Sequence, residues 1–234
     1  MSRFHINNKE WKCFDASKFY YKNFNHVENA NSFFGLDFFY KEIYFWGVES
    51  PTNCCYENFD CVINEGDVVV DLGANIGLFS VRAAQTASKV IAVEASTEAF
   101  SCLVENTRDF ENVECLNSVV VGDNDDNTDK LLSESPFIYS KKMNYLNLTL
   151  EKIMEICKLD RIDFLKIDIE GFEYDVLGSL SIENLAKIDK IACETHDSEK
   201  DKYFELYGKN KKTWVWFFDN GNSSENFSYF LTNK

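Results

Sequence analysis

The chain has few of the residues that mark unusual structural classes. Its 234 residues include only 2 prolines and 10 glycines, and no stretch of uncharged apolar residues approaches membrane-spanning length. A helix that crosses a bilayer needs roughly 18 or more consecutive apolar residues. Collagenous and low-complexity chains are rich in glycine or proline, and disordered chains are poor in apolar residues. With 45% apolar and 27% charged residues, the sequence predicts an ordinary folded protein with one hydrophobic core.

Positive charge is also scarce, which limits the partners that the protein can bind. Lys and Arg together number 24, against 39 Asp and Glu, so the formal net charge is −15. Such a charge repels the phosphodiester backbone of nucleic acids, and no local cluster of basic residues offsets it. We therefore expect a small-molecule, glycan or protein substrate, and no nucleic acid.

The eight cysteines lack the spacing of a metal site or a redox pair. There is no CxxC pair and no histidine at zinc-finger spacing. Most of these cysteines stand among apolar residues, where a free thiol behaves as a small hydrophobic side chain. Free thiols indicate a reducing compartment, and the amino terminus has no apolar signal core. The sequence therefore predicts a cytoplasmic protein.

Aromatic residues are concentrated at the amino terminus. Residues 1–64 contain 17 of the 36 Phe, Tyr and Trp side chains. This segment has no clean helical period, so we expect short strands or a cap that packs on the core of the remaining residues, 65–234. The aromatic rings either close the core or line a substrate pocket, and the sequence leaves both roles open.

From residue 65 onward the pattern is typical of alternating strands and helices. Short apolar runs predict buried strands at 68–70, 90–93, 113–121, 162–169 and 190–194. Apolar residues at helical spacing predict helices at 76–87, from 97 onward, at 150–157 and at 174–180. Alternating units of this length form a parallel, doubly wound sheet. Two late aromatic runs, 213–218 and 227–231, flank an Asp-Asn-Gly-Asn turn and predict a final antiparallel hairpin.

The turn after the first of these strands is the most informative segment. It reads Asp71-Leu72-Gly73-Ala74-Asn75-Ile76-Gly77. Ligands bind where parallel strands end, because glycine lets the backbone come close and a following helix offers N–H groups. The spacing DxGxxxG lacks the second glycine of a GxGxxG dinucleotide fingerprint, so a nicotinamide oxidoreductase is disfavoured. The Asp71 carboxylate would repel a pyrophosphate and attract an amino or sulfonium cation.

A second carboxylate completes this cofactor hypothesis. Glu94 follows the next predicted strand, 23 residues beyond Asp71, where an acidic side chain can accept hydrogen bonds from both hydroxyls of a ribose. A ligand with a ribose and a cationic amino acid is S-adenosylmethionine. Taken alone, either carboxylate has an alternative interpretation as a helix cap.

The segment 162–173 contains a second cluster of ionisable residues. Strand alternation places Lys166, Asp168 and Glu170 on one side of the predicted strand. Charged groups in a buried strand must be paired or must face a cavity. For Lys166 an ion pair and a catalytic role remain equally open. Asp168 and Glu170 stand at the carboxyl end of the strand, where a catalytic role is favoured.

His196 is the one histidine at the predicted ligand-binding edge. It follows Glu194 by two residues, after the fifth predicted strand. A neutral imidazole beside a carboxylate can take a proton from a substrate hydroxyl. A solvated residue at the end of a strand is the alternative interpretation. His5 and His26, in the aromatic segment, are predicted to be structural.

Together these residues resemble the FkbM family of S-adenosylmethionine-dependent methyltransferases. The resemblance spans about residues 65–196 and rests on DLGANIG, VIAVEAS, LTLEKIM, IDFLKIDIEGFEYDVL and ACETH. It implies a Rossmann-like class I methyltransferase fold, with seven strands in the order 3-2-1-4-5-7-6 and strand 7 antiparallel. It further implies that Asp71 and Gly73 hold the methionine part and Glu94 the ribose. The same resemblance places Asn117 and Ser118 at the adenine edge.

The resemblance predicts a methyltransferase, most simply an O-methyltransferase. We expect the turn residues Asn75 and Gly77 to belong to the cofactor site, and Asp168, Glu170 and His196 to the catalytic site. Family members act on hydroxyls of sugars and of secondary metabolites, so the same substrate class is implied here. The alternative is a non-catalytic protein that binds S-adenosylmethionine as a scaffold. No motif indicates a metal ion or an oligomeric state, and Glu151 stands where the family usually has Asp.

Overall fold

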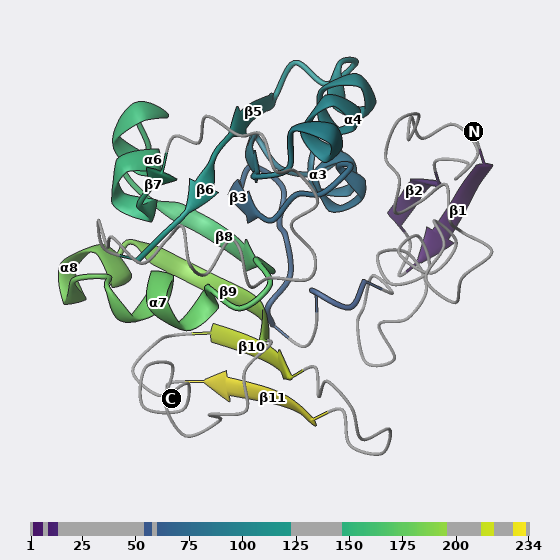
Figure 1. The fold of residues 1–234 in the computed structure, drawn as a ribbon. Coiled ribbons are helices and arrows are strands. Elements are labelled where there is room, and N and C mark those ends of the chain that lie inside the picture. Colours follow the sequence, from purple (N-terminus) through teal and green to yellow (C-terminus); the bar gives the residue numbers. More distant parts are fainter. Residues whose placement is uncertain are drawn as a thin grey trace.

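A computed structural model describes residues 2–6, 9–13, 54–57, 60–122, 147–195, 212–217 and 227–232. Its centre is a seven-stranded sheet in the order β11-β10-β9-β8-β3-β4-β5 (Figure 1). Its first five strands along the chain are all parallel: β3 (Val68–Leu72), β4 (Lys89–Glu94), β5 (Val113–Asn117), β8 (Ile162–Ile167) and β9 (Ile188–Thr195). Numbered along the chain, they stand in the order 3-2-1-4-5. The predicted parallel α/β sheet is therefore present.

The last two strands differ from the order that the resemblance implied. β10 (Lys212–Phe217) pairs with β9 in parallel, and β11 (Phe227–Thr232) pairs with β10 antiparallel at the edge of the sheet. The order therefore ends 5-6-7 instead of 5-7-6. The physical reason is that a hairpin motif specifies only the pairing of its two strands with each other. Which of the two then pairs with β9 depends on contacts that the motif does not contain.

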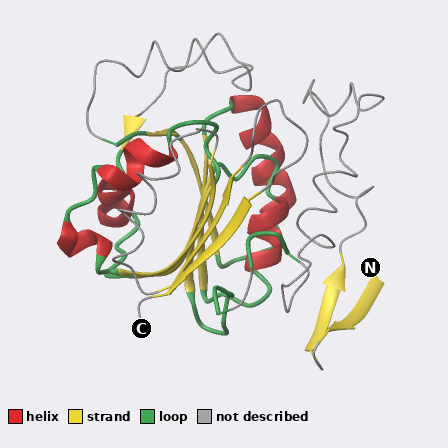
Figure 2. Ribbon diagram, turned by 90° about the horizontal axis from the view of Figure 1, so that it is seen from below, coloured by secondary structure: helices red, strands yellow, loops and turns green. Residues whose placement is uncertain are grey.

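Helices cover both faces of the sheet (Figure 2). On one face lie α3 (Leu78–Ala83) and α4 (Thr97–Thr107), and on the other lie α6 (Leu150–Ile156), α7 (Glu173–Gly178) and α8 (Ile182–Leu185). Side-chain caps define three of the starts. The Ser96, Thr149 and Ser181 hydroxyls accept hydrogen bonds from N–H groups in the first turns of α4, α6 and α8.

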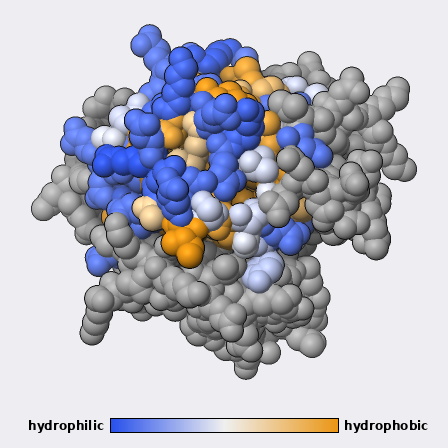
Figure 3. Space-filling view, turned by 90° about the vertical axis from the view of Figure 1, so that its left-hand side faces the viewer, coloured by the Kyte–Doolittle hydropathy of each residue, from blue (hydrophilic) through white to orange (hydrophobic). Residues whose placement is uncertain are grey.

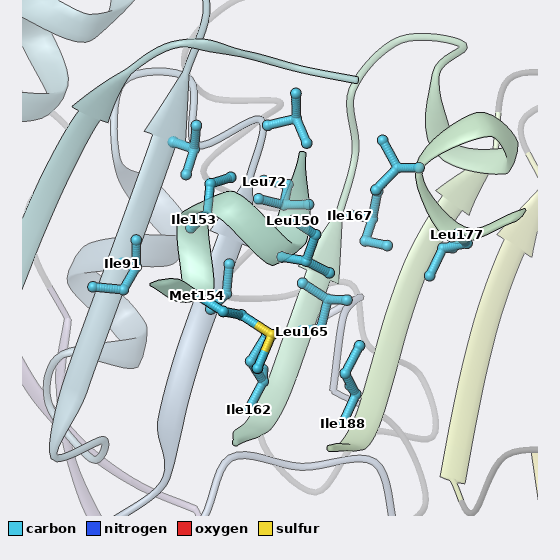
Figure 4. Close-up of a cluster of buried hydrophobic side chains, with 14 of the residues drawn as sticks. Leu72, Ile91, Leu150, Ile153, Met154, Ile162, Leu165, Ile167, Leu177 and Ile188 are labelled. Atoms are coloured by element: carbon cyan, nitrogen blue, oxygen red, sulfur yellow. The ribbon is translucent and has the colours of Figure 1, made fainter. Parts of the chain in front are cut away.

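Strand alternation divides the core into two layers. Val70 and Leu72 pack with α6 and α7 in the cluster shown in Figure 4, together with residues such as Leu165 and Ile167 of β8. Val69, on the opposite side of β3, packs with α3 and α4 in a second cluster. Runs such as Val68-Val69-Val70 have no polar face because both faces of these strands are covered.

The end of the amino-terminal segment belongs to the α3 side of this core. Cys54, Tyr56 and Cys61 are buried there beside Phe79 of α3. Glu57, between them, is almost completely buried and forms an ion pair with Arg82 of α3, with Oε2 2.7 Å from Nη2. The buried residues of the described parts, 54–57 and 61–63, therefore pack against α3 and the sheet. The boundary at residue 64 stays a prediction.

Other parts of the amino-terminal segment are described only in part. β1 (Ser2–Ile6) and β2 (Lys9–Cys13) form an antiparallel pair, in line with the expected short strands. Residues 14–53 lie outside the described residues. A further pair, β6 (Val119–Val120) and β7 (Asn147–Leu148), is parallel and extends from the end of β5.

The surface over α6 and α8 is mostly hydrophilic, with small apolar areas between the charged side chains (Figure 3). Ile156 and Ile182 are the exposed apolar side chains on these two helices. In the described part of the chain, no helix combines the length and the apolar character needed to cross a membrane.

Free cysteines occupy the core, as predicted. Of the seven cysteines whose side chains the structure describes, six are buried and all seven are free. Burial raises the pKa of the Cys102 thiol to about 11, and that of Cys157 to about 11 with a further contribution from Glu114. These thiols are therefore protonated and unreactive at neutral pH. Within the described residues, no three His, Cys, Asp or Glu side chains are arranged to hold a metal ion.

Candidate active site

Four ionisable side chains meet at the carboxyl ends of neighbouring strands. Asp71 stands near the end of β3, Glu94 at the end of β4, Lys166 near the end of β8 and Glu194 near the end of β9. In each strand, the residue two positions earlier is apolar, and alternation places the pair on the same face as α3. The sheet therefore gathers these groups at one edge, on the α3 side.

Most backbone N–H groups of the turn 73–77 are hydrogen-bonded within the protein. The N–H groups of Gly73 and Ala74 both donate to the carbonyl of Val93, at 3.0 and 2.9 Å, and the N–H of Gly77 donates to the carbonyl of Ala74. The Asn75 N–H donates to the Glu94 carboxylate. α3 has only six residues and no side-chain cap. The free N–H groups that the sequence led us to expect at this turn are thus already hydrogen-bonded at four of its five residues.

Gly73 is required for the packing of β3 against β8. Its φ is +77°, and a Cβ built on it would lie 1.6 Å from the carbonyl oxygen of Asp168. Any side chain here would displace the backbone of Asp168. The predicted close approach at this glycine is therefore an approach between two strand ends of the protein itself.

Asp71 and Lys166 form a buried ion pair. Asp71 is fully buried, and its Oδ1 lies 3.2 Å from Lys166 Nζ. Its Oδ2 accepts a hydrogen bond of 2.6 Å from the Ser80 hydroxyl of α3. The Lys166 ammonium donates instead to the carbonyls of Gly73, at 2.7 Å, and Leu72, at 3.3 Å. The sequence left an ion pair and a catalytic role open for Lys166, and the structure provides the partner of an ion pair, Asp71.

The surroundings of Lys166 keep it charged. Burial on its own would lower its pKa, but Asp71, Asp168 and Glu194 favour the ammonium and raise the pKa above its ordinary value. The ammonium also lies 5.1 Å from the centre of the Tyr56 ring. Lys166 is therefore a fixed positive charge between two carboxylates at neutral pH.

Glu94 is held by two backbone donors. Oε2 accepts from the N–H of Asn75 at 2.8 Å, and Oε1 accepts from the N–H of Ser96 at 2.7 Å. Burial raises the pKa of this carboxyl group, and the two backbone hydrogen bonds only partly oppose that effect. Each oxygen keeps a second lone pair. The carboxylate is thus fixed in place and can still accept hydrogen bonds from a ligand.

Two buried oxygen atoms at the turn accept no hydrogen bond. They are Asp71 Oδ1 and Asn75 Oδ1. The contact of Asp71 Oδ1 with Lys166 has the distance of an ion pair but not the geometry of a hydrogen bond. Asn75 itself adopts φ +51°. Buried polar atoms are nearly always hydrogen-bonded, so Asn75 Oδ1 indicates a ligand that brings a donor, whereas the Lys166 ammonium already compensates Asp71 Oδ1.

Asn117 and Ser118 stand at the end of β5, beside the end of β4. The Asn117 amide donates to the carbonyls of Glu94, at 2.8 Å, and Ala95, at 3.2 Å. The Ser118 N–H donates to the carbonyl of Glu94 at 3.1 Å. Both residues therefore tie β5 to the strand end that bears Glu94. Their predicted role at the adenine edge stays a prediction.

The prediction that Lys166, Asp168 and Glu170 lie on one face of a strand is wrong, because the strand ends before Asp168 and Glu170. β8 ends at Ile167, and Glu170 adopts φ +58° in a turn. The turn is caused by the buried carboxylate of Glu173, for which the sequence suggested no role. Glu173 accepts hydrogen bonds of 3.1 Å from the N–H groups of Ile169 and Gly171, and this fixes the turn. Asp168 precedes the turn, with its own N–H bonded to the Leu72 carbonyl.

Tyr56 reaches this edge from the amino-terminal segment. Its hydroxyl lies 2.8 Å from Asp168 Oδ2 and 2.8 Å from Glu194 Oε2. Sequence reasoning did not single out Tyr56, since nothing near it in the chain relates it to strands more than 100 residues away. His196, the predicted base, lies outside the described residues.

A comparison with protein families matches residues 71–222 to a profile described as "Methyltransferase FkbM domain". The match spans more than half of the chain and confirms the resemblance predicted from the motifs. No curated protein matches the chain.

Comparison with solved structures finds methyltransferases at low similarity. An rRNA methylase from Streptococcus thermophilus is 16% identical, with TM-score 0.45, over 73% of this chain and 89% of that one. Precorrin-6y C5,15-methyltransferase from Geobacter metallireducens is 11% identical, with TM-score 0.42, over 74% and 79%. For Trm5b from Pyrococcus abyssi, at 17% identity and TM-score 0.32, 54% of this chain covers only 27% of that one. Such scores are too low to indicate the acceptor.

Proposed function

Because the chain belongs to the FkbM methyltransferase family, we propose that it transfers a methyl group from S-adenosylmethionine to a hydroxyl oxygen. The acceptor that we propose is a sugar, a glycan or a secondary-metabolite small molecule. S-adenosylmethionine is the methyl donor of this family. The choice of a hydroxyl oxygen rests on the chemistry of the site.

One observation supports the proposal above all others. The turn after β3 offers hydrogen-bond acceptors to a ligand, not donors. Its N–H groups at Gly73 and Asn75 are used within the protein, whereas Asn75 Oδ1 is buried and accepts no hydrogen bond, and each Glu94 oxygen accepts only one backbone hydrogen bond. A pyrophosphate needs donors. An amino acid ammonium and the hydroxyls of a ribose supply donors, and S-adenosylmethionine has both.

The residues present therefore fit this methyl donor. We assign Asp71 and Asn75 to its amino acid part and Glu94 to the two ribose hydroxyls. Asn117 and Ser118 would border the adenine, on the strand next to Glu94. The donor supplies an activated methyl group on a sulfonium, so the protein has only to align the acceptor, take a proton and exclude water.

Asp168 is the group we propose for the acceptor side. Its side chain is 23% exposed, and the ammonium of Lys166 lies 3.6 Å from its Oδ2. An aspartate side chain within reach of the acceptor can take the proton of a hydroxyl. Glu170 and His196 remain predicted members of this side.

The charge of the site favours a neutral acceptor. Asp71, Glu94, Asp168 and Glu194 stand against the single cation Lys166 among the described residues of the site. This balance attracts a sulfonium and repels a phosphodiester. It supports a sugar or another uncharged alcohol over a nucleic acid.

Binding and transfer can be tested in turn. Calorimetry with S-adenosylhomocysteine tests the donor site, and radiolabelled S-adenosylmethionine with glycan extracts tests methyl transfer. The proposal expects saturable binding and label in a carbohydrate fraction that is stable to mild base, as an ether is. Binding without transfer to any hydroxyl acceptor would favour the scaffold alternative. Label only in nucleic acid would overturn the acceptor class.

A further inference from the structure

Glu173 is a buried carboxylate close in the chain to the acceptor side of the site. It is the first residue of α7, and it is only 1% exposed. Its Oε1 accepts hydrogen bonds of 3.1 Å from the N–H groups of Ile169 and Gly171, and its Oε2 lies 3.1 Å from the same N–H of Gly171. A buried carboxylate is stable only when it is hydrogen-bonded or paired. Here the backbone of the turn before α7 provides hydrogen bonds to it.

The turn that Glu173 holds has an unfavourable backbone conformation. Glu170 adopts φ +58° and Gly171 adopts φ +110°, so two consecutive residues have positive φ. A residue other than glycine is strained there, and such strain persists only where the surrounding structure enforces it. The hydrogen bonds of Glu173 to the N–H groups on either side of Glu170 provide this support. Strain of this kind is concentrated at functional sites, and this turn directly follows Asp168.

Asp168 stands between two backbone N–H groups that are both hydrogen-bonded. Its own N–H donates to the carbonyl at the end of β3, at 3.1 Å, and the next N–H, that of Ile169, donates to Glu173. The backbone of Asp168 is therefore held by β3 on one side and by α7 on the other. Lys166 and Tyr56 contact the carboxyl group itself. The position of this group in the site thus depends on its backbone as well as on its side-chain contacts.

We propose that Glu173 is a positioning residue that holds the Asp168 carboxyl group where it can take the acceptor proton. The proposal rests on the proposed function, which assigns Asp168 to the acceptor side. As the methyl group moves, the acceptor proton passes to Asp168, the electron pair left on oxygen forms the new bond to carbon, and the pair of the C–S bond stays on sulfur. Glu173 acts through the peptide group between Asp168 and Ile169. A displacement of about 1 Å in a reacting group can lower a rate by about 10²-fold.

Glu173→Gln tests this role with little change in side-chain volume. Both carboxylate oxygens contact the N–H of Gly171, so in either orientation the new amide NH₂ replaces one of these acceptors with a donor. With radiolabelled S-adenosylmethionine and the glycan extract, we expect turnover to fall about 10- to 100-fold. The KM for S-adenosylmethionine and the dissociation constant of S-adenosylhomocysteine should change less than about twofold. Glu183→Gln, the same change at an exposed residue in the first turn of α8, should keep wild-type turnover.

A double-mutant cycle separates positioning from a contribution to stability alone. In an Asp168→Asn background the proposed base is already lost, so Glu173→Gln should lower turnover by less than about twofold further. A residue that only stabilises the fold would lower the free energy of unfolding without changing the turnover of folded protein. Gly171→Ala is a second variant in case Glu173→Gln does not fold. Its Cβ would meet nothing within 4 Å, so it strains only the backbone of the turn and should show the same dependence on Asp168.

The outcomes separate this proposal from the proposed function. If the wild-type protein transfers methyl groups and the folded Glu173→Gln and Gly171→Ala variants keep wild-type turnover, this proposal is wrong and the proposed function stands. Equal losses in the wild-type and Asp168→Asn backgrounds would also overturn it, because Glu173 would then act by another route. If the wild-type protein binds no S-adenosylhomocysteine, or transfers no methyl group to a hydroxyl, the proposed function fails first and this proposal fails with it.

Discussion

The ammonium of Lys166 lies 3.2 Å from a carboxylate oxygen of Asp71, and both side chains are almost completely buried. The same ammonium donates a 2.7 Å hydrogen bond to the carbonyl of Gly73. One cation thus compensates the carboxylate of β3 and fixes the start of the glycine turn. The proposed donor site is therefore held in shape by the protein's own charges.

Replacement of Lys166 by methionine should strongly destabilise the fold. It would leave Asp71 buried without a counter-ion, a loss of about 3–5 kcal/mol in the free energy of unfolding. Because the pKa of Lys166 is raised above 10.5, its contribution is fully present below that pH and is lost only as the pH rises further. Denaturant unfolding should therefore show a constant difference between about pH 6 and 9. A difference that disappears within this range would contradict a permanently charged Lys166.

Gly73→Ala should cost more stability than the same change at Gly66. Both glycines have positive φ, at +77° and +86°, so both variants have the strain of a left-handed alanine. Only at Gly73 would the new Cβ meet the Asp168 carbonyl; at Gly66 nothing lies within 4 Å. We expect an additional loss of about 1–3 kcal/mol at Gly73 from overpacking. Equal losses, measured by denaturant unfolding, would show that the approach of β3 to β8 is not tight.

Asp168→Asn should reduce methyl transfer while leaving the affinity for S-adenosylhomocysteine nearly unchanged. The amide keeps the shape of the carboxylate but cannot take a proton, so we expect a fall of about 10²–10⁴-fold in turnover. Glu155→Gln, a change in an exposed i,i+3 pair with Lys152 on α6, is the matched control and should have no effect. Loss of folding in Asp168→Asn would indicate a purely structural ion pair with Lys166.

His196→Ala separates the two candidate bases. If Asp168 takes the acceptor proton, this variant should keep turnover within about tenfold of wild type and keep the shape of the pH–rate profile. The sequence-based prediction expects the opposite, namely lost turnover with intact donor binding. A base at His196 also predicts that the wild-type rate falls as the pH drops through about 6.5, where an ordinary imidazole becomes charged.

The parallel sheet and the placement of the proposed donor residues at its strand ends could be predicted from the sequence because local patterns determine them. Short apolar strands that alternate with helices predict a parallel sheet with right-handed crossovers, whereas the order 3-2-1-4-5 is implied by the resemblance to the FkbM family. The spacing of Asp71, the turn 73–77 and Glu94 places them at adjacent strand ends, as the register of β3 and β4 confirms.

The remaining features depend on contacts between distant segments. The hairpin pattern could not show that β10 rather than β11 would pair with β9. Tyr56 contacts residues 112 and 138 positions away, and its neighbours in the chain contain no motif. The apolar pattern predicted a strand over 162–169, whereas β8 ends at Ile167 and Glu173 binds the N–H groups of the turn that follows.

The central claim is that Glu94 and the turn 73–77 bind S-adenosylmethionine. Its most direct test is the dissociation constant of S-adenosylhomocysteine for Glu94→Ala, measured by calorimetry beside a Glu105→Ala control on the exposed side of α4. Because ribose hydroxyls would lose charge-assisted hydrogen bonds, we predict weaker binding by about 1–3 kcal/mol for Glu94→Ala and no change for the control. A folded Glu94→Ala protein that binds with the wild-type constant would remove Glu94 from the site and contradict the account.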